Sequence, residues 1–404
     1  MTADERPHAE IADLHARVRT FLSEHPVGGD RVEFLRARFD AGLAWVHYPV
    51  GLGGLGLRRE LQSVVDAELA AVGAPDNDPR RIGIGLGMAA PTILAQGTDE
   101  QRQRWLRPLW TGEQVWCQLF SEPGAGSDLA SLGTRAVRDA DEWVVNGQKV
   151  WTSMAHEAQW GILVTRTDPD VPKHAGMTYF VCDMTAPGVE VRPLRQITGE
   201  AEFNEVFLTD VRIPDAYRLG SVGDGWRVAQ TTLMNERVAI GGAAMPREAG
   251  MIGIVCEQWR ARPELRTVAK QDELVRLWVE AEALRLTGLR LRQQLAVGAP
   301  GPEGSAAKLG FARLNQEISG FEVELLGADG LRYDGWSTDN WATERPDTVD
   351  FVGRSAGYRY LRSKGNSIEG GTSEILRNII SERVLGLPRE AGTDKTLAWK
   401  DQPR

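Results

Sequence analysis

Two carboxylates of this chain are candidates for acid–base chemistry, and the first precedes a pair of glycines near the C-terminal end. It is Glu369, in the stretch RSKGNSIEGGTSEI (362–375). A carboxylate acts as a general base when burial raises its pKa, and the alternative for Glu369 is an ordinary solvated side chain. The glycines favour a tight turn, and Thr372 or Ser373 is a typical N-cap for the helix predicted to follow.

The second carboxylate is Glu236, in the stretch TTLMNERVAIGG (231–242). Helical spacing places Glu236 on one broad face with Leu233 and Ile240. Arg237 lies on the same face. A carboxylate beside leucine and isoleucine is costly to bury unless it is paired or has a use, so Glu236 is a candidate functional residue. The alternative is that it pairs with a nearby cation on a partly exposed face.

A glycine-rich segment, CQLFSEPGAGSDLASLGT (117–134), has the composition of a ligand-binding loop. Its glycines allow a close approach of the backbone to a ligand, and successive free N–H groups can bind a phosphate. No GK[ST] sequence follows, which excludes a Walker loop, and no strand-to-helix context supports a dinucleotide fingerprint. The alternative is a surface loop between a helix and a sheet.

A further candidate element is Trp151, which ends a predicted strand beside Thr152 and Ser153. A flat aromatic ring with neighbouring hydroxyl groups is suited to border a planar cofactor. A tryptophan in the core or at an interface is the alternative interpretation.

The elements that must position these residues differ along the chain. From residue 9 to about 115 apolar residues recur at helical spacing, with one helix predicted to open at Thr98. From Trp116 to about 213 the period becomes two, and Asn146-Gly147 is predicted to form a hairpin turn between the runs EWVV and QKVWTS. Helical spacing then returns and continues to the C-terminal region.

The sequence therefore predicts an α+β protein of three domains. A helical domain is expected at 1–115, an antiparallel β domain at 116–220 and a helical bundle at 221–404. Gly386 and Pro388 mark the end of the last predicted helix.

The composition bounds the classes of function. The net charge is −9 with interspersed signs, which gives no footprint for nucleic acid. The three scattered cysteines fit reduced thiols rather than a disulfide framework or a metal site. The N-terminus has no apolar signal region, and no apolar run is long enough to span a membrane. A cytoplasmic protein without membrane insertion is expected.

Together the motifs resemble the acyl-CoA dehydrogenase flavoprotein family. The resemblance covers nearly the whole chain and is carried by SEPGAGSD (121–128), NGQKVWTS (146–153), VFLTDVRIP (206–214), GDGW (223–226) and EGGTSEILRNIISERVLG (369–386). It implies an N-terminal helical domain, a middle β domain and a C-terminal four-helix bundle. It also implies FAD bound between the β domain and the bundle, and dehydrogenation of an acyl-CoA thioester.

The resemblance assigns roles to particular residues. FAD contacts are implied for Leu119, Phe120, Ser121, Gly126, Ser127, Trp151, Thr152, Ser153, Thr372 and Glu374. Ser127 is also implied to lie near the pantetheine of acyl-CoA. The last two FAD contacts lie at a predicted helix N-terminus, where N–H groups favour anions.

The catalytic base is expected at Glu236. Most family members carry the base in a Tyr-Glu-Gly-Thr motif before the last helix, but a gapless alignment places Gly370 at that position and Glu369 one residue away. Glu236 matches the base of isovaleryl-CoA and long-chain acyl-CoA dehydrogenases, and Arg237 matches an arginine near the substrate. The Gly370 backbone N–H is expected to donate to the thioester carbonyl.

Two departures from the family pattern affect residues that, in the family, contact the FAD bound by a neighbouring subunit. Arg262 lacks the Phe-Gly that usually follows, and Glu324 and Ala328 replace a glutamine and a glycine. A glutamate facing a pyrophosphate repels it. One hypothesis is a hetero-oligomer in which a sister chain supplies the missing half of the FAD site. A homo-oligomer, either a dimer or a tetramer, is the alternative that stays open.

The resemblance also implies an electron-transfer flavoprotein as the electron acceptor. Two alternatives to a dehydrogenase are a non-catalytic subunit and an oxidase-like enzyme.

Overall fold

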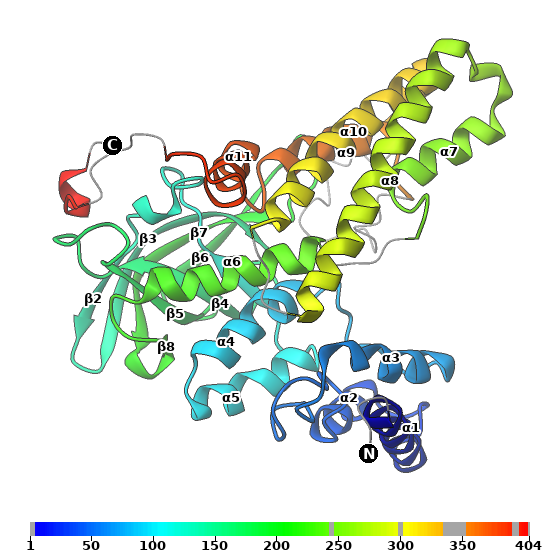
Figure 1. The fold of residues 1–404 in the computed structure, drawn as a ribbon. Coiled ribbons are helices and arrows are strands. Elements are labelled where there is room, and N and C mark those ends of the chain that lie inside the picture. The colour runs from blue at the N-terminus through cyan, green and yellow to red at the C-terminus, as the bar shows by residue number, and fades with distance from the viewer. Residues whose placement is uncertain (1–4, 242–245, 298–301, 334–352, 390–395, 403–404) are drawn as a thin grey trace.

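The computed structural model describes residues 5–241, 246–297, 302–333, 353–389 and 396–402. Its N-terminal part is helical (Figure 1), with α1 (Glu5–Glu24), α2 (Arg31–Asp40), α3 (Gln62–Ala71), α4 (Ala90–Gln96) and α5 (Asp99–Trp110). The predicted start of α5 is confirmed, because the Thr98 side chain accepts a hydrogen bond from the backbone of Gln101 and the Gln101 side chain bonds back in a capping box.

Within the described residues, eight strands form a single sheet. They are β1 (Trp116–Leu119), β2 (Arg135–Asp139), β3 (Glu142–Ser153), β4 (Trp160–Arg166), β5 (Met177–Asp183), β6 (Val189–Leu194), β7 (Phe203–Pro214) and β8 (Arg218–Leu219). Their order is β6-β7-β3-β2-β4-β5-β8, and β1 pairs with β4. Most pairings are antiparallel as predicted, but β1 runs parallel to β4 and β2 meets β4 in parallel at Arg135 and Arg166.

Every residue of β4 is buried, because both of its faces are covered. Ile162 and Val164 pack with residues of α4, α5 and the helix that follows the sheet. Leu163, on the opposite face, packs with Val206 and Leu208 of β7. A strand buried on both faces reads as a continuous apolar run rather than an alternating one.

The predicted hairpin turn at Asn146-Gly147 is wrong. β3 continues through both residues, and the turn between β2 and β3 lies at residues 140–141. The side chain of Asn146 instead donates to Asp210 of β7 at 2.9 Å, and a β-carbon at Gly147 would collide with Thr134. The close approach of a neighbouring chain segment, and not a turn, therefore requires this glycine.

The C-terminal part is again helical. It contains α6 (Gly225–Gly241), α7 (Met251–Ala261), α8 (Val268–Val297), α9 (Gly304–Leu326), α10 (Ala356–Ser363) and α11 (Ser373–Ile379). α6 contacts β5, α4 and α9, so it joins all three regions (Figure 1). The predicted cap of α11 is confirmed at Thr372, whose side chain accepts a hydrogen bond from Ile375. None of the described helices is both long and apolar enough to cross a membrane.

Candidate active site

Three segments that are distant in the sequence meet where the sheet adjoins the C-terminal helices. The backbone N–H of Val150 donates to the carbonyl of Ser121 at 2.9 Å, which joins the glycine-rich loop to the end of β3. The hydroxyls of Ser127 and Thr372 lie 3.4 Å apart, which joins the same loop to the start of α11. The structure thus brings together the loop, Trp151 and the helix N-terminus that the sequence singled out.

The loop exposes the residues that are expected to meet a phosphate. Leu119 and Phe120 are buried where β1 ends, and Ser121 is partly buried. Gly126 and Ser127 are exposed, and a β-carbon at Gly126 would meet nothing within 4 Å. The exposed half of the loop therefore has an open side beside Thr372.

Trp151 has an unusual backbone conformation. Its φ is +60°, and 57% of the residue is exposed. The pairing of β3 with β7 shifts register here, and the indole ring lies edge-on to Phe203 with the ring centroids 5.9 Å apart. A positive φ in a bulky residue is strained and is found most often at functional sites. Beside it, the buried hydroxyl of Thr152 has no hydrogen-bond partner among the described residues, and Ser153 is partly buried.

A buried lysine that was not among the residues predicted from the sequence supports the loop from behind. Lys149 is fully buried, and its ammonium group donates to the carbonyl of Phe120 at 3.0 Å and to Glu122 at 2.8 Å. The same carboxylate accepts the backbone N–H groups of Gly133 at 2.7 Å and Thr134 at 2.9 Å. Lys149 and Glu122 therefore fix both ends of the glycine-rich loop.

The charges of this pair depend on each other. Burial lowers the pKa of Lys149, although Glu122 opposes the change. Burial alone would raise the pKa of Glu122, but the ammonium group of Lys149 and the hydrogen-bond donors around the carboxylate bring it below its usual value. A buried ion pair of this kind is strongly destabilised when one partner is removed.

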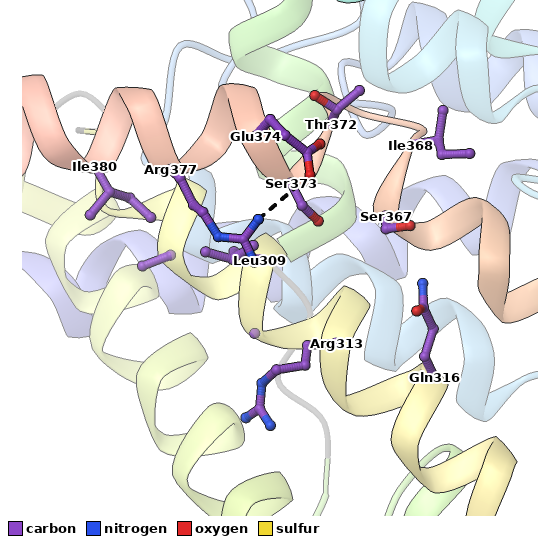
Figure 2. Close-up of a pocket in the computed structure, with 12 residues that line it drawn as sticks. Leu309, Arg313, Gln316, Ser367, Ile368, Thr372, Ser373, Glu374, Arg377 and Ile380 are labelled. Carbon is purple, nitrogen blue, oxygen red and sulfur yellow. Dashed lines mark ion pairs between the residues drawn. The ribbon is translucent and has the colours of Figure 1, made fainter. Parts of the chain in front are cut away.

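A pocket of about 560 Å³ opens between α9 and α11 (Figure 2). Thr372, Ser373 and Glu374 line it at the N-terminus of α11, and the carboxylate of Glu374 lies 3.6 Å from Arg377. The remaining lining residues are Ala306, Leu309, Gly310, Arg313, Gln316, Ser367, Ile368, Arg377 and Ile380. The two residues expected at the phosphate and ribose end of FAD, Thr372 and Glu374, thus share one cavity.

The carboxylate of Glu369 is occupied by neighbours in its own chain. Arg362 donates to it through two nitrogens, at 3.2 and 2.9 Å, and Asn366 donates to it at 2.7 Å. Arg362 also lies 3.6 Å from Glu202, which is in the segment that leads into β7. Because three donors of its own chain already occupy its oxygens, this carboxylate is poorly placed to meet a substrate.

The turn after Glu369 presents a backbone donor. Gly370 and Gly371 have φ values of +62° and +95°, which L side chains adopt only with strain. Lys308 stabilises the turn by donating to the carbonyls of Asn366 at 2.7 Å and Gly371 at 2.8 Å. Among the described residues, the N–H of Gly370 donates no backbone or side-chain hydrogen bond.

Glu236 and Arg237 lie in α6, but their side chains are outside the part of the chain that the structure describes. One helical turn earlier, the buried hydroxyl of Thr232 lies 2.9 Å from the hydroxyls of both Thr92 and Tyr179. The face of α6 that carries Thr232 therefore packs between α4 and β5.

The group of charges around Arg362 gives a prediction for stability. Burial raises the pKa of Glu202, and Arg362 opposes that rise. The folded state therefore binds the carboxyl proton of Glu202 more tightly than the unfolded state does. As a result, the free energy of unfolding falls as the pH rises from the unfolded pKa of Glu202 through its folded pKa. Arg362→Met is expected to cost about 1–3 kcal/mol near neutral pH, because it leaves two partly buried carboxylates, those of Glu202 and Glu369, without their cation, and less in mild acid. Urea unfolding at the two pH values measures this, and an equal loss at both would contradict it.

Family models match the three parts of the chain in order. They are those of the acyl-CoA dehydrogenase N-terminal domain, over residues 8–113, the middle domain, over 117–211, and the C-terminal domain, over 223–385. The chain belongs to the acyl-CoA dehydrogenase family. It is accordingly an oxidoreductase that acts on a CH–CH group of an acyl-CoA and uses FAD.

Two mycobacterial relatives are similar over most of this acyl-CoA dehydrogenase. The chain is 43% identical to acyl-CoA dehydrogenase FadE34 of Mycobacterium tuberculosis over 94% of its own length, but it spans only 50% of FadE34. It is 37% identical to acyl-CoA dehydrogenase IpdE1 of the same organism, with 91% of each chain covered.

Two solved structures are similar across the whole fold. One is the ChsE4-ChsE5 complex from Mycobacterium tuberculosis, with 30% identity, a TM-score of 0.70 and coverage of 96% of this chain and 99% of the other. The other is the Tcur3481-Tcur3483 steroid ACAD, with 28% identity, a TM-score of 0.70 and coverage of 95% and 98%. The α+β fold with a middle β domain, predicted from the sequence, is confirmed.

The residues of this structure fit the cofactor. Trp151 offers an exposed flat ring at a strained position, next to the unpartnered hydroxyl of Thr152. Ser127 of the glycine-rich loop lies within 3.4 Å of Thr372, and Thr372 lines the cavity at the N-terminus of α11. A planar group with an anionic diphosphate needs these two features side by side.

Proposed function

We propose that this chain introduces a double bond between the α and β carbons of an acyl-CoA thioester, with Glu236 as the base that removes the α-proton. The observation that carries the assignment is the binding of Glu369 by Arg362 and Asn366, which leaves no free carboxylate at the EGG turn. When bound, FAD supplies the acceptor at N5 for the β-hydride. We place FAD against the loop residues, Trp151 and Thr372.

The backbone of Gly370 has a part in the same reaction. Its N–H donates no hydrogen bond among the described residues, and Lys308 fixes the turn that presents it. A donor held in this way stabilises the negative charge that develops on the thioester oxygen as the α-proton leaves. This role needs no side chain, so a glycine performs it where most members of the family carry the base. Arg237, next to Glu236, is proposed to contact the substrate, and so is Ser127.

The substrate class is proposed from two supports. A base on α6 instead of the EGG turn changes the shape of the acyl pocket, in a way that suits long, branched or ring-bearing acyl chains. One similar solved structure is named a steroid ACAD. We therefore propose a ring-bearing acyl-CoA as the preferred substrate.

An anaerobic spectral titration tests the reaction and the substrate together. Purified, FAD-loaded protein is mixed with straight-chain, branched and ring-bearing acyl-CoA thioesters, and the flavin absorbance is followed. Bleaching by a ring-bearing thioester at the lowest concentration is expected. The absence of bleaching with every thioester would contradict the proposed activity, and a preference for a short straight chain would contradict the substrate class.

We propose an electron-transfer flavoprotein as the acceptor of the electrons, and an oxidase that delivers them to oxygen is the alternative. Aerobic peroxide formation during turnover separates the two. Peroxide in amounts equal to the enoyl product would favour the oxidase.

As a second proposal, this chain belongs to a hetero-oligomer in which it forms only half of an FAD site, called here the half-site. The surroundings of Arg262 favour this proposal. Its guanidinium lies 3.0 Å from Glu264 and 3.3 Å from Asp329, so two carboxylates of the same chain already neutralise it. Glu324 is exposed near the C-terminal end of α9. An arginine that is already paired twice is a poor site for a partner's diphosphate, and an exposed glutamate would repel a diphosphate that it faced. The similar ChsE4-ChsE5 structure is a complex of two named chains.

The FAD content of the purified protein tests this half-site. We expect well below one FAD per chain when the protein is produced alone, because no copy can complete its neighbour's site. Co-expression with a sister chain is expected to restore binding. Flavin absorbance against protein concentration measures the ratio, and one FAD per chain in a homo-oligomer would contradict the proposal.

A further inference from the structure

The last described segment, residues 396–402, packs beside the sheet and away from the bundle helices α8 and α9 (Figure 1). The backbone N–H of Trp399 donates to the carbonyl of Val171 at 2.9 Å, and that of Lys400 donates to Pro169 at 3.1 Å. The side chain of Lys400 lies 2.7 Å from Asp170. The segment therefore binds along the connection between β4 and β5 through both backbone and side chains.

Trp399 is the residue through which this segment reaches the glycine-rich loop. Its indole nitrogen donates to the carbonyl of Ser131 at 3.2 Å. Its ring lies over the guanidinium of Arg166, 4.9 Å from the ring centroid. Arg166 is only 2% exposed and donates to the carbonyls of Ala130 and Leu132. One tryptophan thus holds three successive residues of the loop, one directly and two through Arg166.

The same loop is held from two other directions. Lys173 lies 2.8 and 2.6 Å from the two carboxylate oxygens of Asp128, at the end of the SEPGAGSD motif. Glu122 accepts the N–H groups of Gly133 and Thr134, where β2 is about to begin. Trp399 acts between these two points, and its contacts come from a part of the chain that nothing in the proposed reaction uses.

We propose that residues 396–402 are a strap and that Trp399 is a positioning residue for residues 128–134. By holding this stretch, the strap fixes the exposed half of the loop, with Gly126 and Ser127, in the conformation that receives FAD. The strap follows from the contacts alone, whereas its effect on FAD also rests on the proposed function.

A matched pair of variants of the full chain, purified with any partner it requires, tests the strap. Trp399→Ala removes an indole that donates one hydrogen bond and covers one guanidinium. Trp278→Ala removes the same two interactions in the bundle, because Trp278 donates to Glu248 at 2.9 Å and lies under Arg247 at 5.7 Å. Hydrogen exchange of residues 128–134 is measured with and without FAD, and FAD retention is measured by dilution.

Trp399→Ala is expected to speed exchange in residues 128–134 and to weaken FAD binding, each by about tenfold, as suits the loss of a hydrogen bond and a cation–π contact. Trp399→Phe keeps a ring over Arg166 but loses the donor, so it is expected to fall between Trp399→Ala and the parent. Trp399→Phe also provides the test of the strap if Trp399→Ala does not fold. Trp278→Ala is expected to leave both quantities unchanged.

Two results would overturn the proposal in distinguishable ways. Unchanged exchange in residues 128–134 of Trp399→Ala would show that there is no strap. Faster exchange with unchanged FAD binding would show that the strap does not act on the cofactor. Neither result bears on Glu236, whose role is tested by turnover.

Discussion

Replacement of Glu236 by glutamine is expected to lower turnover by about 10²–10⁴-fold, the usual contribution of a positioned general base. The amide keeps the size of the side chain but cannot accept the α-proton. Flavin content and the affinity for the acyl-CoA product are expected to stay near the parent values, because the change removes a proton acceptor and little binding surface. Steady-state assay with an electron-acceptor dye measures the loss.

Glu369→Gln is the matched control for this prediction. The same change is made in the second candidate carboxylate, whose oxygens are bound by Arg362 and Asn366. Its turnover is expected to fall by less than about tenfold, from disturbance of the turn alone. A larger loss in Glu369→Gln than in Glu236→Gln would show that the base lies at the EGG turn after all.

Removal of the buried ammonium group at Lys149 is expected to have the largest effect on stability. Lys149→Met leaves the carboxylate of Glu122 buried without its cation, and breaking a buried pair in this way costs about 3–5 kcal/mol. The carbonyl of Phe120 loses its donor as well. Urea unfolding followed by circular dichroism gives the free energy of unfolding.

The control removes a cation from an ion pair of the same length at the surface. Arg17 lies 2.8 Å from Asp13 on α1, with 53% and 63% of the two side chains exposed. Arg17→Met is expected to cost only about 0.3–0.5 kcal/mol. A free energy of unfolding for Lys149→Met within about 1 kcal/mol of the parent would contradict the role of Lys149.

Local sequence chemistry predicted two helix starts correctly. Thr98 and Thr372 cap α5 and α11 because a hydroxyl that accepts from the first turn is a local interaction. The Asn146-Gly147 turn was wrong because a tertiary contact, the close approach of Thr134, decides the conformation there. The proposed domain boundaries and site residues stay predictions, although the structure brings most of those residues together.

The supporting residues of the site were missed for two different physical reasons. Lys149 had a readable signal, since alternation along β3 from the buried Val145 places it inward, where a charge needs a partner. Glu122 is that partner. Trp399 had no such signal, because Ser131 is 268 residues earlier in the chain and no local pattern reports so distant a contact.

The measurement that tests the central claim most directly is α-proton exchange in a substrate that cannot be oxidised. An acyl-CoA with sulfur in place of the β-carbon has no β-hydrogen to transfer, so only the base acts on it. Loss of deuterium from its α-carbon in ordinary water is followed by mass spectrometry with the FAD-loaded protein. We predict that the parent and Glu369→Gln exchange the deuterium, and that Glu236→Gln exchanges it at least about a hundredfold more slowly. Exchange by Glu236→Gln at the parent rate would show that another group removes the proton.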